Sequence, residues 1–310
     1  MNRRFHRSVA GVAAMATAFA VGACGSDSES DSGTRSVESP NGTVEIPTDP
    51  QAALGMYTTD VDVLLTLGFP LAKLQPIRAE YDSLPSYLPS DAIEGVQTFA
   101  NFPEFDYETL ATADPDFILN SLAYEPDTLT TLPEIAPTYS YNGFDGTPWR
   151  EHFEQTARDL DRTEQYDAWT KTYEDRIAEV KEAIGSRADG LTVAPASFFD
   201  GQVYLACQAI CSVYDDLGID VYEGARSNDG KGVTISVEEL SQLSDVDVLV
   251  TTKGADSDEN SLTPLEGNPL YMNLPAVQNG QVFAFQRDLI FGSPSGQLAL
   301  LDQVEQDLTS

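Results

Sequence analysis

The sequence predicts an α/β protein of two lobes, each with a mainly parallel open sheet flanked by helices, joined by one long helix. Two observations predict this class. Short apolar strand-like runs alternate with helical segments in both halves of the chain. Between the halves, apolar residues recur every three or four positions, the period of one helix face. The expected lobes are residues 43–148 and 189–310, and residues 149–188 connect them.

The first half predicts helices that end at clear stop signals. Residues 61–67 have helical spacing and end at Gly68, a typical helix C-cap. Residues 107–113 form a second expected helix, which Asp114-Pro115 stops because the residue before a proline disfavours helical backbone. The apolar run 116–119 then reads as a buried parallel strand.

The second half repeats this alternation of strands and helices. Expected strands cover residues 191–194, 203–205, 247–251 and 280–285, and expected helices cover residues 213–217, 237–243 and 298–308. The first of these helices is stopped by Gly218. Alternation of this kind is typical of mainly parallel sheets.

The connecting region contains one long amphipathic helix. Its apolar face is spaced at 4, 4, 3 and 4 residues: Trp169, Tyr173, Ile177, Val180 and Ile184. A helix over residues 164–186 would be about 34 Å long, enough to bridge two lobes. No second long amphipathic helix is expected beside it, so a helical bundle is disfavoured.

The first 23 residues have the features of a bacterial lipoprotein signal. Three arginines precede an apolar run over 9–21, and residues 21–24, Val-Gly-Ala-Cys, resemble a lipobox. The run is shorter than the roughly 20 residues that span a bilayer. Cys24 is therefore expected to carry the lipid, including palmitate. A plain secretory signal or a membrane anchor is the alternative.

Residues 24–42 are expected to form a flexible tether, because they are almost all Gly, Ser, Asp, Glu, Thr and Pro. The signal would take three of the 17 basic residues and none of the 50 acidic ones, which leaves a net charge of −36. Such a field repels nucleic acid and anionic membrane surfaces. Solubility at high salt or in a crowded envelope is the simple explanation of the acidity.

Beyond Cys24 the chain has only two cysteines, Cys207 and Cys211, which are expected to form a disulfide in an oxidising compartment. A zinc or haem site would need more ligands than the chain offers. His152 is the only histidine after the signal, and its place beside Phe153 predicts a surface position. A histidine-rich metal site is thereby excluded, an all-carboxylate site is not, and no metal site is predicted.

Three stretches, in their order, resemble the extracytoplasmic substrate-binding proteins of ABC importers for iron-siderophores, haem and cobalamin. They are residues 107–119 (YETLATADPDFIL), residues 235–240 with 245–250, and the helical region 149–184. The resemblance implies two lobes on a rigid helix, with a ferric siderophore held between them and no covalently bound cofactor. It also implies a lipid-anchored monomer at the outer side of the cell membrane.

In this family one exposed glutamate on each lobe docks onto basic residues of the membrane subunits. Glu108 and Glu238 match those positions, and Glu239 is a rival for Glu238. A carboxylate at a helix start is also favoured by the helix dipole, so N-terminal capping alone is the alternative. Haem or cobalamin is the second ligand class, with Tyr124 as an axial ligand for haem. A surface lipoprotein without transport function is a further alternative.

Ligand contacts are expected in the loops after the carboxyl ends of strands, where ligands gather in open α/β sheets. These loops combine aromatic rings with isolated cations. The arginines would donate paired hydrogen bonds to metal-bound oxygens, or else form surface ion pairs. Trp149 and Phe199 could instead pack in the core. The expected ligand residues are Arg78, Tyr81, Asn101, Tyr124, Trp149, Phe199, Arg226 and Arg287.

Catalysis is not expected, because the chain contains no Ser-x-x-Lys or Gly-x-Ser-x-Gly motif. A Ser-His-Asp triad would have to use His152.

Overall fold

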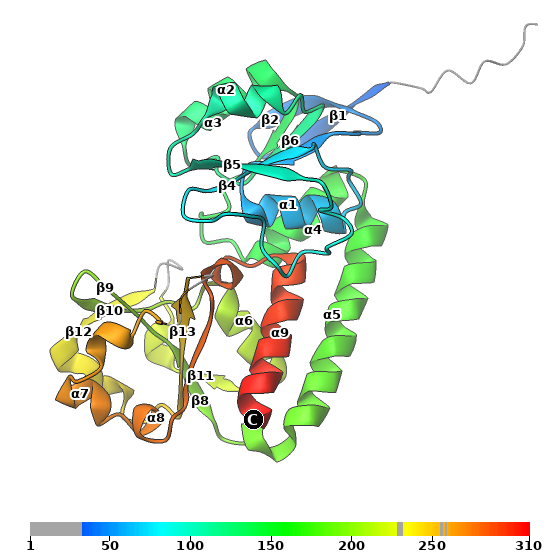
Figure 1. Cartoon of the computed structure of the whole chain (residues 1–310). Coiled ribbons are helices and arrows are strands. Elements are labelled where there is room, and N and C mark those ends of the chain that lie inside the picture. The colour runs from blue at the N-terminus through cyan, green and yellow to red at the C-terminus, as the bar shows by residue number, and fades with distance from the viewer. Residues whose placement is uncertain (1–32, 228–231, 255–256, 258) are drawn as a thin grey trace, which may run out of the picture. The chain divides into compact units, whose positions relative to one another are not determined.

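The computed structural model describes residues 33–310 except 228–231, 255–256 and 258, and residues 33–310 form one unit (Figure 1). The predicted signal, Cys24 and the first part of the predicted tether lie outside the described residues. No helix in the described part of the chain is long and apolar enough to cross a membrane.

A β-hairpin opens the described chain. Strand β1, Thr34–Ser39, pairs antiparallel with β2, Gly42–Pro47. The prediction of a flexible tether up to residue 42 is therefore wrong from Thr34 onwards. Val37 and Ile46 are buried in the main core, and this burial stabilises a segment whose average composition is polar.

The first lobe contains two small parallel sheets. One has the order β3-β6-β7, and the other pairs β4 with β5. The helices confirm the expected stops, since α1 is followed by Gly68 with a φ of 79° and α2 ends before Asp114-Pro115. The elements are β3 Ala53–Gly55, α1 Thr58–Thr66, β4 Leu74–Arg78, β5 Gln97–Phe102, α2 Tyr107–Thr112, β6 Phe117–Asn120, α3 Pro126–Ile135 and β7 Thr138–Ser140.

The connecting region has two helices, α4 Trp149–Asp159 and α5 Thr163–Ile184, followed by the 3-10 turn η1, Gly185–Ala188. The predicted apolar face of α5 is correct, and Trp169, Tyr173, Val180 and Ile184 are buried. The expectation that no long helix accompanies α5 is wrong. The last helix, α9 Pro294–Thr309, runs beside it (Figure 1).

Arg176 of α5 joins this pair of helices, because its guanidinium bonds both Asp302, at 2.7 Å, and Glu305 of α9. Leu300, Leu301 and Val304 of α9 enter the same core cluster as the apolar face of α5. Only the tertiary contact shows that α9 has a long buried face.

The second lobe has a four-stranded parallel sheet in the order β11-β8-β13-β14 and a three-stranded antiparallel sheet in the order β12-β10-β9. The strand predicted at residues 203–205 belongs to the antiparallel sheet. The strands are β8 Thr192–Pro195, β9 Ser197–Phe199, β10 Gln202–Leu205, β11 Asp220–Val221, β12 Val233–Ser236, β13 Val248–Lys253 and β14 Val282–Gln286.

Short helices fill the spaces between these strands. The predicted helix over residues 237–243 is a 3-10 helix, η3 Val237–Leu243. The predicted helix over 213–217 is the end of a longer one, α6 Gln208–Leu217, which Gly218 terminates with a φ of 79°. The others are η2 Glu223–Ala225, η4 Thr263–Leu265, α7 Pro269–Met272, α8 Pro275–Gln278 and η5 Arg287–Ile290.

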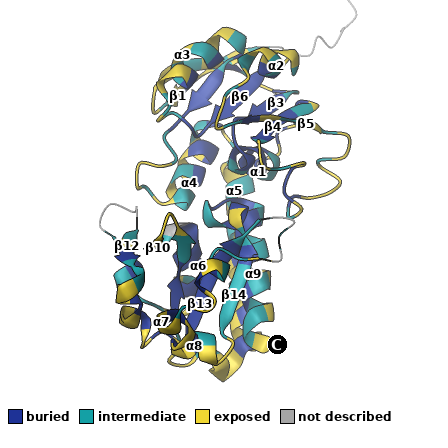
Figure 2. Cartoon of the chain, turned by 60° about the vertical axis from the view of Figure 1, so that its left-hand side comes forward, coloured by how far each residue is buried: buried dark blue, intermediate teal, exposed yellow. Residues whose placement is uncertain are grey.

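One continuous core joins the two lobes. It contains Leu64 and Phe117 of the first lobe, Trp169 of α5, Val193 and Val248 of the second lobe. Figure 2 shows these elements buried, with the exposed positions on the outer helices and loops. The core connects the lobes through α5 and α9, so both sides of the candidate site are built on one packed scaffold.

Candidate ligand-binding site

Arg78, at the end of β4, is the centre of the candidate site. Its Nη1 donates a hydrogen bond to the Tyr57 hydroxyl at 2.8 Å, and its Nε donates to Oε1 of Glu80 at 2.5 Å. The guanidinium carbon lies 4.9 Å from the centroid of the Phe102 ring, within reach of a cation–π interaction. The sequence prediction placed Arg78 among the ligand residues, and the structure sets it against aromatic faces.

Five rings form what we call the aromatic cluster: Tyr57, Phe102, Tyr124, Phe144 and Phe291. In the spatial order Phe102, Tyr57, Phe291, Phe144, Tyr124, neighbouring ring centroids lie 5.3 to 6.1 Å apart. All four pairs meet edge to face, which is a favoured geometry for aromatic pairs. Phe291 follows β14 in the second lobe, and the other four belong to the first lobe. Phe144 is 49% exposed and Tyr124 38% exposed, so the cluster is packed at one end and open at the other.

Asp288, in η5 of the second lobe, interacts electrostatically with Arg78. Its side chain is buried, and burial raises the pKa of its carboxyl, while the hydrogen bond from the Tyr81 hydroxyl and the charge of Arg78 lower this pKa. Burial also raises the pKa of the Tyr81 hydroxyl, and the Asp288 carboxylate raises it further. The structure therefore brings Tyr81, Arg78 and Asp288 together from two lobes.

The other predicted ligand residues lie apart from the aromatic cluster or are engaged elsewhere. Trp149 packs against the core, and the centroid of its ring lies 5.5 Å from that of Trp169. Arg226 is paired with Asp215 at 2.6 Å, the surface ion-pair alternative. Phe199 is 72% exposed on β9, so the alternative of core packing is wrong for this residue. Arg287 is exposed and forms no ion pair among the described residues.

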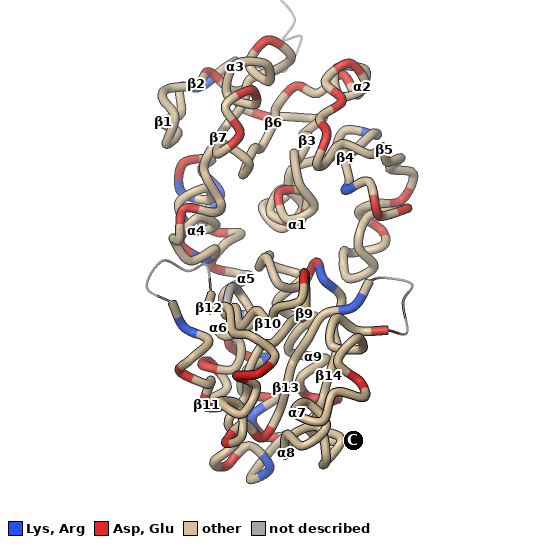
Figure 3. Tube along the Cα trace, turned by 90° about the vertical axis from the view of Figure 1, so that its left-hand side faces the viewer, with Lys and Arg blue, Asp and Glu red and all other residues tan. Residues whose placement is uncertain are grey.

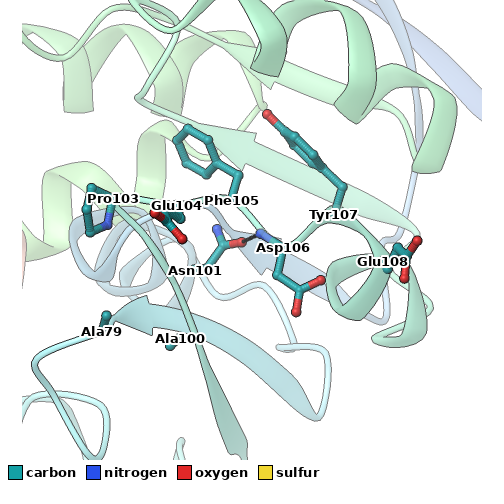
Figure 4. A pocket seen from close by; sticks show the side chains of 9 residues that line it. All are labelled: Ala79, Ala100, Asn101, Pro103, Glu104, Phe105, Asp106, Tyr107 and Glu108. Carbon is teal, nitrogen blue, oxygen red and sulfur yellow. Dashed lines mark hydrogen bonds between the residues drawn. The ribbon is translucent and has the colours of Figure 1, made fainter.

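Asn101 lies under a cavity of about 730 Å³ in the first lobe (Figure 4). The amide is 1% exposed, and its Oδ1 accepts a hydrogen bond from the backbone of Asp106 at 2.9 Å. This bond holds the loop between β5 and α2. The cavity is lined by Ala79, Ala100, Asn101, Pro103, Glu104, Phe105, Asp106, Tyr107 and Glu108.

The two glutamates expected to dock onto a permease both lie exposed in the first turn of a helix. Glu108 is the second residue of α2, which Asp106 caps. Glu239 closes the capping box of η3, because its Oε2 accepts from the Ser236 amide at 2.9 Å. Glu238 beside it makes no hydrogen bond within the described chain and stays exposed. The capping hydrogen bond thus occupies the carboxylate of Glu239, whereas the carboxylate of Glu238 stays available for contact with a partner.

His152 is partly buried, where the sequence predicted a surface position. Its ring lies 4.8 Å from the ring of Tyr141, its side chain is 14% exposed, and its Nε2 is 3.2 Å from Asp145. Among the described residues, no group of three or more His, Cys, Asp or Glu side chains is arranged to hold a metal ion.

Cys207 and Cys211 form the predicted disulfide. The bond joins Cys207, the N-cap residue of α6, to Cys211 in the first turn of the same helix. It therefore fixes the start of α6, shortly after β10.

Residues 57–289 match the family described as periplasmic binding protein. The chain belongs to this family. Its curated relatives include the petrobactin-binding protein YclQ of Bacillus subtilis, 24% identical over 94% of this chain and 95% of that protein. The putative ABC transporter substrate-binding lipoprotein YhfQ of the same organism is 21% identical over 86% of each chain.

Solved structures share the fold of this periplasmic binding protein. Staphylococcus aureus SirA, complexed with staphyloferrin B, has a TM-score of 0.71 at 18% identity and covers 89% of this chain and 98% of its own. A periplasmic solute binding protein from Mycobacterium smegmatis has a TM-score of 0.72 at 21% identity, with the same coverage.

Several residues of this periplasmic binding protein's candidate site escaped the sequence prediction: Tyr57, Glu80, Phe144, Asp288 and Phe291. Tyr57 and Phe144 follow β3 and β7, three-residue strands that no periodicity reveals. Had these strands been recognised, the rule that ligands gather after carboxyl strand ends would have indicated both aromatics.

Proposed function

We propose that this chain is the extracytoplasmic, lipid-anchored substrate-binding protein of an ABC importer, which captures a ferric siderophore between its lobes and delivers it to the permease. The single observation that carries the proposal is the position of Arg78 within the aromatic cluster, to which both lobes contribute rings. The petrobactin-binding relative and the staphyloferrin B complex of SirA support a siderophore as ligand.

The site suits such a ligand chemically. A siderophore already surrounds its iron with oxygen atoms, so the protein needs to supply no iron ligand. The exposed rings of Tyr124 and Phe144 can cover the apolar shell of the complex, while a guanidinium N–H of Arg78 reaches its oxygen acceptors. Phe291 then closes the contact from the second lobe.

Haem or cobalamin binding is the second candidate function. The exposed Tyr124 favours it, because a tyrosine hydroxyl can serve as an axial haem ligand. His152 is a poor axial ligand in this structure, since Asp145 holds its Nε2 and Tyr141 covers its ring.

Titration of the purified protein separates these candidates. Ferric hydroxamates, ferric catecholates, ferric citrate, haem and cobalamin are added in turn while fluorescence of the two tryptophans is followed. We expect a ferric siderophore to quench at the lowest concentration. Arg78→Ala should weaken that binding about 10- to 150-fold, the range for a hydrogen bond to a charged group. Arg158 is an exposed arginine on α4 that forms an ion pair with Glu154 of the same helix. The variant Arg158→Ala is therefore the control, and it should bind normally. Absence of quenching by every ferric complex refutes the proposal.

Delivery can be tested apart from binding. We propose that Glu108 and Glu238 face the permease, so the variant Glu108→Ala with Glu238→Ala should keep its ligand affinity while uptake by cells falls sharply. Glu134→Ala with Glu266→Ala removes two other exposed glutamates, one on each lobe, and should transport normally. Normal uptake by the Glu108 and Glu238 variant would defeat the docking assignment.

A further inference from the structure

Asp60 of α1 is a fully buried carboxylate that joins three segments of the candidate site. Its Oδ2 accepts hydrogen bonds from the amide of Tyr57, at 3.2 Å, and from the amide of Ser121, at 3.1 Å. The hydroxyl of Tyr141 donates to its Oδ1 at 3.4 Å. These donors directly follow β3, β6 and β7, which are neighbours in one parallel sheet. One carboxylate therefore ties together three adjacent strand ends.

Each of these strand ends carries a ring of the aromatic cluster. Tyr57 itself belongs to the cluster, and Tyr124 and Phe144 each lie three residues beyond a donor to Asp60. The rings of Tyr124 and Phe144 meet edge to face at 5.3 Å, although they follow different strands. A displacement at Asp60 would therefore move three of the five rings relative to one another.

Two further buried side chains bridge the same row of strands. Gln75 of β4 accepts a hydrogen bond from the amide of Gly55 in β3 at 3.0 Å, and Asn120 of β6 donates to the hydroxyl of Ser140 in β7 at 3.2 Å. Both side chains are fully buried, like Asp60. Figure 3 shows the acidic positions of α1 next to β3, β4 and β6 in the first lobe. Satisfied buried polar networks rigidify their surroundings, and Asp60 is the ionisable member of this one.

Burial determines when Asp60 is charged. Desolvation raises its pKa to about 7, while the hydrogen bonds that it accepts lower it. Burial and the charge of Asp60 raise the pKa of the Tyr141 hydroxyl, which therefore stays protonated as a donor. The ring of Tyr141 lies 4.8 Å from that of His152, whose Nε2 is 3.2 Å from Asp145. Hydrogen bonds to an ionised carboxylate are about twice as strong as those to a neutral acceptor, so the strand ends are held more firmly above this pKa.

We propose that Asp60 is a positioning residue of the binding site, which holds the ends of β3, β6 and β7 in the arrangement that the ferric complex requires. This inference rests on the proposed function. Asp60 acts through the segments that it holds and does not contact the ligand. When its carboxyl is protonated, it accepts weaker hydrogen bonds and holds the three strand ends less firmly.

Variants of the full-length protein test this role with the ferric complex that binds most tightly in the fluorescence titration above. Asp60→Ala removes the shared acceptor and should raise the Kd about tenfold, as expected when the binding arrangement is populated about one tenth of the time. Asp60→Asn can keep its carbonyl oxygen towards both amides and should retain most of the affinity. Val246→Ala, in the separate core cluster of the second lobe, is the control. It should lower the melting temperature and leave the affinity unchanged.

The pH profile distinguishes positioning from structural support alone. In the wild type the affinity should rise severalfold from about pH 6 to about pH 8 as Asp60 ionises, even though a buried charge destabilises the whole fold. In Asp60→Asn this rise should be absent, and the comparison cancels any titration of the ferric complex itself. Without ligand, the NMR signals of the Tyr57 and Ser121 amides and of the Phe144 ring should follow one common transition in the wild type and none in Asp60→Asn.

Wild-type affinity in a folded Asp60→Ala variant, or identical pH profiles for the wild type and Asp60→Asn, overturns the positioning role but leaves the siderophore function intact. If Asp60→Ala does not fold, the pH profiles of the other two proteins decide. If no ferric complex binds to the wild type, the proposed function itself fails and the positioning role falls with it.

Discussion

Asp62 offers a quantitative test of how the lobes are held together. It lies on α1 of the first lobe, is fully buried, and its Oδ2 accepts hydrogen bonds from the amides of Ser295, at 2.8 Å, and Gly296, at 3.2 Å. Both amides belong to the first turn of α9, whose N-cap residue, Ser293, makes no side-chain capping bond. The helix is therefore capped by a residue far away in the sequence.

Asp62→Ala should lower the free energy of unfolding by about 2–4 kcal/mol, because it leaves two N–H groups without an acceptor, at about 1–3 kcal/mol for each buried group. Asp62→Asn keeps an acceptor oxygen and should cost about 1 kcal/mol. The cost is small because burial raises the pKa of Asp62, so the ionised carboxylate is itself penalised. Asp302→Ala, which removes an exposed ion-pair partner on α9, should cost less than about 1 kcal/mol.

Urea unfolding followed by tryptophan fluorescence measures these differences. The indole of Trp169 donates a hydrogen bond to the carbonyl of Pro294 at 3.0 Å, next to the cap, so the signal reports on this junction. Amide hydrogen exchange at Ser295 and Gly296 should accelerate in Asp62→Ala and stay slow in Asp302→Ala. A loss below about 0.5 kcal/mol in Asp62→Ala, within the range of neutral surface changes, would refute the capping role.

Three further predictions concern pH, redox state and anchoring. Burial raises the pKa of Asp60 to about 7, so the native state keeps a proton that the unfolded chain loses near its ordinary value of 3.8. Stability should therefore fall as pH rises from about 4 to about 7, by at most about 1.4 kcal/mol per pH unit from this group, and Asp60→Asn should remove that slope in urea unfolding; an unchanged slope would exclude Asp60 as its source. Cys207 and Cys211 should resist alkylation in the folded protein until a reductant is added, and mass spectrometry that finds two alkylated thiols without reductant would contradict the disulfide. Cys24→Ala should release a folded protein from the cell envelope, and equal membrane retention on fractionation would rule out the lipid anchor.

The elements with strong local signals were predictable from the sequence alone. Gly68, Gly218 and Asp114-Pro115 end their helices where expected, because a left-handed φ or a proline acts on its immediate neighbours. The apolar period of α5 was equally visible, since one helix face repeats within four residues. Tyr124 was proposed from the general rule for carboxyl strand ends, and Arg78 as one of the few isolated cations of a very acidic chain.

Only the tertiary structure decided which of these residues meet. The pairing of β10 with β9 and β12, the long buried face of α9, and the encounter of Asp288 with Arg78 all join segments distant in the chain. A local pattern records how a segment alternates between apolar and polar positions, but it carries no record of its neighbours in space. Burial likewise depends on those neighbours, which is why the buried carboxylate of Asp62, which caps a helix far away in the sequence, became visible only in the folded protein.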